Sequence, residues 1–191
     1  MRIIAGTKRG MKLLPPKGGT TRPIIDRVKE SIFNVLYKYD LIKGRTVADL
    51  FCGTGSFGLE ALSRGAKRVC FVESNTQVIE ILKKNIQKAR FESQAEVIRT
   101  NVFTAGAPLQ NPADKYSLIF VDPPFAATAD TGKDSPLGRL LCSLGDRLAE
   151  DGIVVVRTEK NNRLQDKYGP LHIVDARQWS SMLVTFLRME K

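Results

Sequence analysis

The sequence has few of the residues that bind metals or form disulfides. Its 191 residues include one histidine and three cysteines, an odd number without the spacing of metal ligands. Because the cysteines lack that spacing and only one histidine is present, we expect neither a zinc site nor another metal. The chain lacks an apolar run of about 18 residues, and its start lacks the hydrophobic core of a signal peptide. These absences predict a reduced, cytoplasmic protein without a membrane segment.

The net charge of +10 is concentrated near the N-terminus. Residues 1–45 contain eleven Lys and Arg but only three Asp and Glu, a balance of +8 that leaves +2 for the remainder. Such a distribution is typical of proteins that bind a phosphate backbone, although a solvated basic face has the same composition. Gly and Pro interrupt the basic residues, which disfavours an amphipathic helix on a membrane. We therefore expect a nucleic acid as partner.

Strands and helices alternate from residue 45 onward, which predicts a doubly wound α/β fold. We expect a Rossmann-like, mostly parallel sheet of seven strands that ends in an antiparallel hairpin. The strands are predicted at 46–51, 68–72, 95–99, 116–121, 153–156, 171–176 and 182–189, and the main helices at 56–64, 75–90 and 137–148. With 42% hydrophobic residues, the chain can bury a sizeable core.

The first 44 residues are predicted to form a small extension of this sheet domain. Residues 2–14 read as a β-hairpin that turns near residues 8–10, and a linker rich in Pro and Gly follows. A helix is predicted from Asp26 to about residue 39, since apolar side chains recur on one face. We therefore divide the chain into an extension, residues 1–44, and a main domain, residues 45–191.

The first strand of the main domain ends in a glycine-rich loop. Gly53 and Gly55 permit a tight turn and close approach of a ligand, and Gly58 completes the pattern G-x-G-x-x-G. That pattern alone leaves NAD or FAD open. Asp49, just before the loop, would repel a pyrophosphate but attract an ammonium or sulfonium group. Alternatively, Asp49 accepts hydrogen bonds from the loop's own N–H groups.

The ends of the next two strands add candidate cofactor contacts. Glu73 follows Gly53 by 20 residues, the spacing at which an acidic side chain accepts the hydroxyls of a ribose. After the third strand, Asn101 is placed to bond an adenine edge, while Val102 covers the ring. We also count Phe51, in the glycine loop, among the cofactor-binding residues. A ligand with a ribose, an adenine and a positively charged amino-acid end is S-adenosylmethionine.

Asp122, Pro123, Pro124 and Phe125 directly follow the apolar run at 116–121. Ligands of open α/β sheets bind at the carboxyl ends of strands. The prolines lack N–H groups, so backbone carbonyls join the Asp122 carboxylate as acceptors, and Phe125 offers a flat face. This set suits an exocyclic amino group on a planar heterocycle, although a plain turn with a core Phe fits the same four residues.

With these motifs in register, the sequence resembles the RsmD-type family of 16S rRNA (guanine-N2)-methyltransferases, which are class I S-adenosylmethionine-dependent enzymes. The glycine loop and the D-P-P-F motif identify only the broad superfamily. The more specific match consists of Arg22-Pro23, Asp26-Arg27-Val28-Lys29-Glu30 and Phe33-Asn34, and the resemblance covers nearly the whole chain.

The resemblance implies methylation of N2 of a guanine in 16S rRNA, at position 966 in the usual family member, in an assembling small ribosomal subunit. It also implies that the extension contacts RNA, for which Arg9, Lys12, Arg22 and Arg27 are the candidates. Residues 45–191 then form the methyltransferase domain, and we expect a monomer.

The mechanism that we expect is direct displacement, in which guanine N2 attacks the methyl carbon in line. Asp122 and the carbonyl of Pro123 would accept the N–H bonds of N2, and Phe125 would stack on the base. Two alternatives stay open. One is a DNA adenine-N6 methyltransferase, for which the extension is a small recognition region. The other is a non-enzymatic RNA-binding assembly factor with a vestigial pocket.

Overall fold

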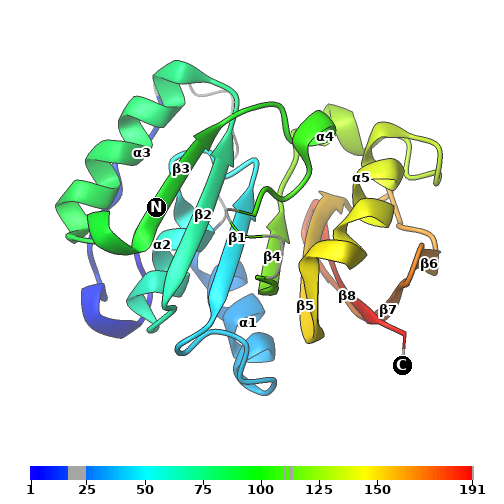
Figure 1. Ribbon diagram of the computed structural model, residues 1–191, viewed down its shortest axis with the longest axis horizontal. Coiled ribbons are helices and arrows are strands. Elements are labelled where there is room, and N and C mark those ends of the chain that lie inside the picture. Colours follow the sequence, from blue (N-terminus) through cyan, green and yellow to red (C-terminus); the bar gives the residue numbers. More distant parts are fainter. Residues whose placement is uncertain (17–24, 110, 112–113, 191) are drawn as a thin grey trace.

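The computed structural model describes residues 1–16, 25–109, 111 and 114–190. A twisted central sheet carries helices on both faces (Figure 1). The strands are β1 (Thr46–Leu50), β2 (Arg68–Glu73), β3 (Ala95–Arg99), β4 (Tyr116–Val121), β5 (Leu148–Glu159), β6 (Lys167–Tyr168), β7 (Leu171–Trp179) and β8 (Met182–Met189). The α-helices are α1 (Asp26–Tyr37), α2 (Ser56–Ser63), α3 (Thr76–Ala89), α4 (Val102–Ala105) and α5 (Pro136–Leu144).

The strands lie in the order β3-β2-β1-β4-β5-β8-β7-β6. The first five strands pair in parallel, whereas β8 runs antiparallel to β5 and β7 antiparallel to β8. The Rossmann-like, mostly parallel sheet with an antiparallel C-terminal hairpin is thus confirmed. It contains eight strands where seven were expected, because the two-residue strand β6 pairs with β7. A strand of two residues has no hydrophobic alternation that a sequence pattern could reveal.

The structure departs most from the expected boundaries around β5, α5 and the segment after β3, and β7 also extends to Trp179 where 176 was expected. Strand β5 has twelve residues, although only its central part is a continuous apolar run. Helix α5 ends at Leu144, and a short 3-10 turn leads into β5. After β3 the chain forms the short helix α4 where a loop was expected. Backbone hydrogen bonds determine where these elements begin and end, and the hydropathy of the residues does not reveal those positions.

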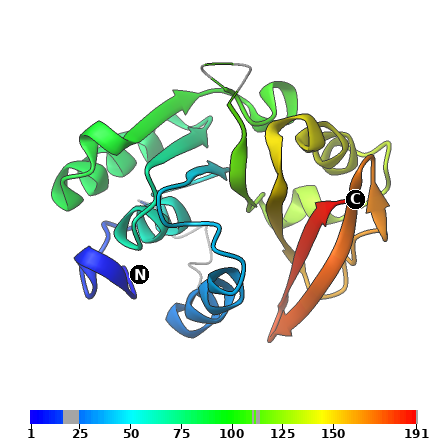
Figure 2. The same cartoon turned by 60° about the horizontal axis from the view of Figure 1, so that its bottom comes forward.

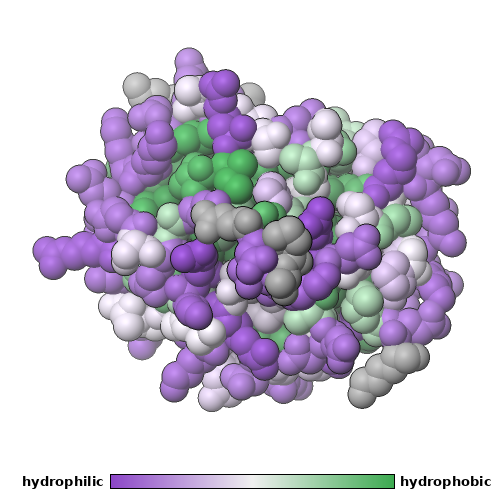
Figure 3. Space-filling view, viewed as in Figure 1, coloured by the Kyte–Doolittle hydropathy of each residue, from purple (hydrophilic) through white to green (hydrophobic). Residues whose placement is uncertain are grey.

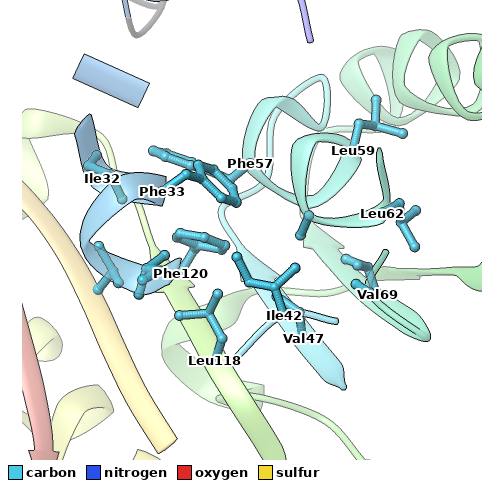
Figure 4. Close-up of a cluster of buried hydrophobic side chains, with 14 of the residues drawn as sticks. Ile32, Phe33, Ile42, Val47, Phe57, Leu59, Leu62, Val69, Leu118 and Phe120 are labelled. Carbon is cyan, nitrogen blue, oxygen red and sulfur yellow. The ribbon is translucent and has the colours of Figure 1, made fainter. Parts of the chain in front are cut away.

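The hydrophobic core consists of two layers, one on each face of the sheet. Helices α1, α2 and α3 cover one face and α4 and α5 the other (Figure 2). On the first face the rings of Phe57 and Phe120 stack with centroids 4.7 Å apart, and Phe33 of α1 lies 5.6 Å from Phe120 (Figure 4). Phe33 therefore joins α1 to the core of the sheet, directly below the strand that carries the D-P-P-F motif.

The N-terminal segment forms an antiparallel turn, as expected, although only one bridge, between Arg2 and Lys12, has strand geometry. The turn docks on α2 because the Glu60 carboxylate accepts hydrogen bonds from the N–H groups of Ile4 and Ala5. Gly6 comes so close to α2 that a Cβ there would lie 1.8 Å from the carbonyl oxygen of Ser63. Most of the predicted linker lies outside the described residues.

A buried ion pair ties the N-terminal segment to α1 and α2. The side chains of Lys29 and Glu60 have no exposed surface, and their Nζ and Oε2 atoms lie 3.2 Å apart. Lys29 also donates to the carbonyl of Arg2 at 2.7 Å. Burial lowers the pKa of Lys29, and the Glu60 charge opposes that effect. The ion pair is thus the polar centre of an otherwise apolar contact.

Figure 3 shows the molecule from the side of Figure 1, with hydrophilic residues around the periphery. Hydrophobic residues are exposed on this side near the edge strand β3. The residues of β3 are mostly half-buried, since one edge of this strand has no neighbour in the sheet. Within the described part of the chain, no helix is long and apolar enough to cross a membrane.

Candidate active site

The carboxyl ends of β1, β2, β4 and β5 surround a cavity of about 800 Å³. Its wall combines residues from the glycine loop, the end of β2 and the D-P-P-F motif. These are Phe51, Cys52, Gly53 and Thr54, then Glu73, Ser74 and Asn75, then Asp122, Pro123, Pro124 and Phe125. Both predicted halves of the site therefore open into one cavity, with room for a cofactor and part of a second ligand.

The glycine loop turns through left-handed backbone conformations. Gly53 has a φ of 55° and Gly55 a φ of 89°. A Cβ at Gly55 would lie 2.5 Å from Cδ1 of Leu82, so only glycine fits against α3. Phe51 also has a positive φ, 55°, which is uncommon for a residue with a bulky side chain. Local strain of this kind is typical of functional sites.

Asp49 lies beneath the loop and not in the wall of the cavity. Only 1% of the residue is exposed, and its Oδ2 accepts a hydrogen bond of 2.8 Å from the N–H of Gly58. Burial raises the pKa of Asp49 well above its usual range, while the bond from Gly58 acts in the opposite direction. In this structure Asp49 holds the N-terminal turn of α2, which is the structural role that the sequence left open.

Glu73 connects β2 to the glycine loop. Its Oε2 accepts from the N–H of Gly53 at 3.1 Å, and its Oε1 accepts from the N–H groups of Ser74 and Asn75 at 2.8 and 2.9 Å. Each carboxylate oxygen has two lone pairs, so Oε1 is fully used by its two N–H donors and Oε2 retains capacity for one further bond from the cavity. The side chain is half-buried and lines the cavity.

Asn101 and Val102 are not among the residues that line the cavity. The Asn101 Oδ1 accepts from the N–H of Phe103 at 3.0 Å and so caps α4, and Val102 is buried in the core. The ring of Phe103 lies 4.9 Å from that of Phe51. Of this group only Phe51 lines the cavity, and the other residues support it from the side.

The D-P-P-F motif leaves β4 at the level of the glycine loop. The N–H of Asp122 donates to the carbonyl of Leu50 at 3.3 Å, which holds the two loops together. The carbonyl of Pro124 accepts from the N–H of Ala127, which begins a 3-10 turn over Phe125–Thr128. Among the described residues, none donates a hydrogen bond to the carbonyl of Pro123. Asp122 and this carbonyl are thus the acceptors at the motif.

Arg157 is a site residue that the sequence reasoning missed. Its Nε donates to Oδ1 of Asp122 at 2.5 Å, and its Cζ lies 5.7 Å from the centre of the Phe125 ring. Burial raises the pKa of Asp122, and the charge and hydrogen bond of Arg157 oppose this rise. The one signal in the sequence is a charged residue directly after the apolar run 153–156 of a central strand.

The candidate RNA contacts are spread over the N-terminal turn and α1. Arg9, Lys12 and Arg27 are exposed, and Arg22 lies outside the described residues. Lys88 of α3 donates to the carbonyl of Lys12 at 2.8 Å, so the basic turn is held beside α3. Within the described ranges, no group of three or more His, Cys, Asp or Glu side chains could hold a metal ion.

Comparisons with known proteins agree over nearly the full length. Residues 1–188 match the family described as conserved hypothetical protein 95. Ribosomal RNA small subunit methyltransferase D of Haemophilus influenzae is 40% identical over 165 residues, 86% of this chain and 81% of that protein. The protein of the same name from Escherichia coli K12 is 34% identical over 166 residues, 86% of this chain and 77% of that protein.

A solved structure supports the same assignment. The Escherichia coli protein yhhF superposes with a TM-score of 0.79 and 30% identity, and the match covers 100% of this chain and 98% of that one. The family match and these full-length relatives lead to one conclusion: the chain belongs to the conserved hypothetical protein 95 family, which is the RsmD-type family that its motifs indicated.

Proposed function

We propose that this protein transfers the methyl group of S-adenosylmethionine to the exocyclic N2 of a guanine in 16S rRNA. The observation that carries the proposal is the single cavity into which both the glycine loop with Glu73 and the D-P-P-F motif open. The relatives named ribosomal RNA small subunit methyltransferase D support rRNA as the substrate. By family resemblance the target is position 966, and the substrate is the assembling small subunit in the cytoplasm.

The residues of the cavity fit S-adenosylmethionine, which supplies a methyl group on a positively charged sulfur when bound. Glu73 accepts hydrogen bonds from the ribose, and the backbone of Gly53 allows close approach of the ligand, while Gly55 packs the loop against α3. The ring of Phe51 provides an apolar face for the adenine. Asp49 supports the site from beneath the glycine loop through its bond from Gly58, and Asn101 caps α4, whose Phe103 packs against Phe51. Asn101 and Val102 remain candidates for the adenine by their place after β3.

The D-P-P-F motif holds the methyl acceptor. The lone pair of a guanine N2 is delocalised into the ring, so the amine is a poor nucleophile. Asp122 and the carbonyl of Pro123 accept its two N–H bonds and favour a more pyramidal nitrogen. Phe125 stacks on the base, and Pro123 and Pro124 fix the backbone between these groups. The base must be unpaired or flipped out to enter the cavity.

The N-terminal extension, residues 1–44, brings the RNA to this cavity. Arg9, Lys12 and Arg27 present exposed positive charge, and Arg22 adds to it by family resemblance. Met1 and Pro16 contribute to the rim of the cavity, so the extension borders the site of methyl transfer. A monomer contains all the groups that this mechanism uses.

The proposal is tested with purified protein, radiolabelled S-adenosylmethionine and 16S rRNA from cells that lack the gene, offered naked and as small subunits. We expect N2-methylguanosine at a single position, identified by mass spectrometry of RNA fragments. Asp122→Ala should bind S-adenosylmethionine but transfer little methyl. Methylated adenine in DNA would favour the alternative enzyme, and wild-type protein that does not bind S-adenosylmethionine would favour the assembly factor.

A further inference from the structure

We propose that Arg157 is a specificity-determining residue that donates a hydrogen bond to the O6 carbonyl of the target guanine. This inference rests on the proposed function and adds a residue for which the motifs provide no role. It follows from three properties of Arg157: its place in the sheet, the partners of its guanidinium, and its unused hydrogen-bonding capacity.

The parallel pairing of β4 and β5 places Arg157 beside the acceptor motif. Val121 and Val156 are partners in the register, so Asp122 and Arg157 are the next residues of the two strands. Both side chains line the cavity. Arg157 thus reaches the methyl-acceptor half of the site from a strand that carries no part of the D-P-P-F motif.

The guanidinium contacts the two groups that the proposed mechanism assigns to the base. Nε donates to Asp122 at 2.5 Å, and Cζ lies 5.7 Å from the centre of the Phe125 ring. A base that stacks on Phe125 and donates to Asp122 must therefore lie against Arg157. The guanidinium becomes part of the surface that meets the edge of the base.

Arg157 has a donor without an acceptor. Its side chain is only 12% exposed, and among the described residues none accepts a hydrogen bond from its buried Nη1. A buried N–H without a partner is unfavourable, and for a charged group more so. Because Arg157 lines the cavity, a ligand bound there can supply an acceptor to the guanidinium.

Guanine complements the Asp122 carboxylate and the Arg157 guanidinium. Along one edge it carries the O6 acceptor followed by the N1–H and N2–H donors, and proteins read such edges in unpaired bases. Arginine is the side chain that most often bonds guanine O6. With N2–H held by Asp122 and the carbonyl of Pro123, the Arg157 guanidinium is the donor that contacts both Asp122 and Phe125 and so lies beside the position of O6.

The test compares guanine with 6-thioguanine at the target position of the RNA that the wild-type protein methylates. 6-Thioguanine retains the N1–H and N2–H donors, but its sulfur accepts hydrogen bonds poorly. We expect kcat/KM of the wild-type protein to fall about 10-fold on 6-thioguanine, as for loss of one hydrogen bond to a charged group. Equal rates on both RNAs would overturn the inference while leaving the proposed function intact. No transfer to either RNA would refute the proposed function.

Three variants locate the effect. Arg157→Met should lower kcat/KM on the guanine RNA and methylate both RNAs at similar rates, and Arg157→Lys should restore part of the preference for guanine. Arg45→Met removes another arginine–aspartate pair, with Asp151 at 3.2 Å, outside the cavity wall, and should keep the wild-type preference. An Arg157→Met protein that still prefers guanine to the wild-type extent would exclude a contact with O6. The wild-type comparison stands even if that variant does not fold.

Discussion

The Nε atom of Arg157 lies 2.5 Å from Oδ1 of Asp122, and the side chains are only 12% and 17% exposed. Burial raises the pKa of this carboxyl group, and the arginine limits the rise. Besides burial, the charges of Asp122 and Glu73 both raise the pKa of Asp49. The ionisation of Asp122 therefore depends on its neighbour in β5.

This dependence predicts a shift in the pH profile. The ionised carboxylate is the better acceptor for N–H groups, so methyl transfer should rise with pH through the pKa of Asp122. Arg157→Met removes the group that lowers this pKa, so the acidic limb of the profile should move to higher pH. Single-turnover rates across the acidic and neutral range would measure the shift. Identical limbs in wild type and variant would contradict it, and Arg45→Met is the control.

Removal of the Asp122 carboxylate should slow methyl transfer without loss of cofactor binding. We expect Asp122→Ala to lose about 100-fold or more in kcat, in line with groups that assist proton transfer. Asp122→Asn should lose less, because its amide oxygen still accepts one N–H bond. Asp151→Asn, on the exposed partner of Arg45, is the matched control. Equal rates for wild type and Asp122→Ala would exclude a role in the reaction.

Glu73 should govern affinity for the cofactor more than the rate of transfer. Glu73→Ala removes the acceptor for the ribose and three hydrogen bonds to the backbone of Gly53, Ser74 and Asn75. We expect the Kd for S-adenosylmethionine to rise by about 10-fold to 100-fold, the usual effect of losing hydrogen bonds to a charged group. Isothermal titration measures this change. The exposed Glu150 provides the control Glu150→Ala, which should bind as wild type does.

The buried ion pair between Lys29 and Glu60 predicts a large difference in stability between two lysine variants. Lys29→Met leaves the buried Glu60 carboxylate without one of its cations and should lower the free energy of unfolding by about 3 kcal/mol. Lys83→Met breaks a surface pair with Glu80, in which both side chains are 59% exposed. This variant should change the free energy of unfolding by less than about 1 kcal/mol. Denaturant unfolding measures both variants. Similar losses of free energy of unfolding would mean that the buried pair stabilises the fold no more than the exposed pair does.

The exposed basic residues of the extension should contribute to RNA affinity through charge. A variant with Arg9, Lys12 and Arg27 changed to Gln should bind RNA more weakly, and the slope of log K against log salt should decrease by about 2. Binding of S-adenosylmethionine should not change, because these side chains do not line the cavity. A triple variant at the exposed residues Lys133, Arg139 and Arg163 is the control. If the variant at Arg9, Lys12 and Arg27 had an unchanged salt slope, these residues would not contact the RNA.

Much of the site was predictable because the carboxyl ends of parallel strands meet at one edge of the sheet. The spacing between Gly53 and Glu73 predicted that Glu73 accepts the hydroxyls of a ribose, which stays a prediction; in the structure both residues line the cavity and a hydrogen bond of 3.1 Å joins them. The two glycines of the loop predicted a tight turn, and Gly55 has a left-handed backbone conformation in that turn. Spacing did not predict the short helix α4 after β3, for which Asn101 is the cap, and the adenine contacts of Asn101 and Val102 stay a prediction.

Local patterns in the chain were thus sufficient for the α/β class, the glycine loop, the D-P-P-F motif and the basic N-terminus, because each depends on neighbouring residues and regular periods. The pairing of Asp122 with Arg157 depends on the strand order and on the register of β5, which are set by packing between distant segments. The position of Asp49 beneath the loop depends likewise on its hydrogen bond from the N–H group of Gly58, because this group points at the carboxylate only once the turn has folded. Long-range packing therefore determines which polar groups face the ligands and which support them.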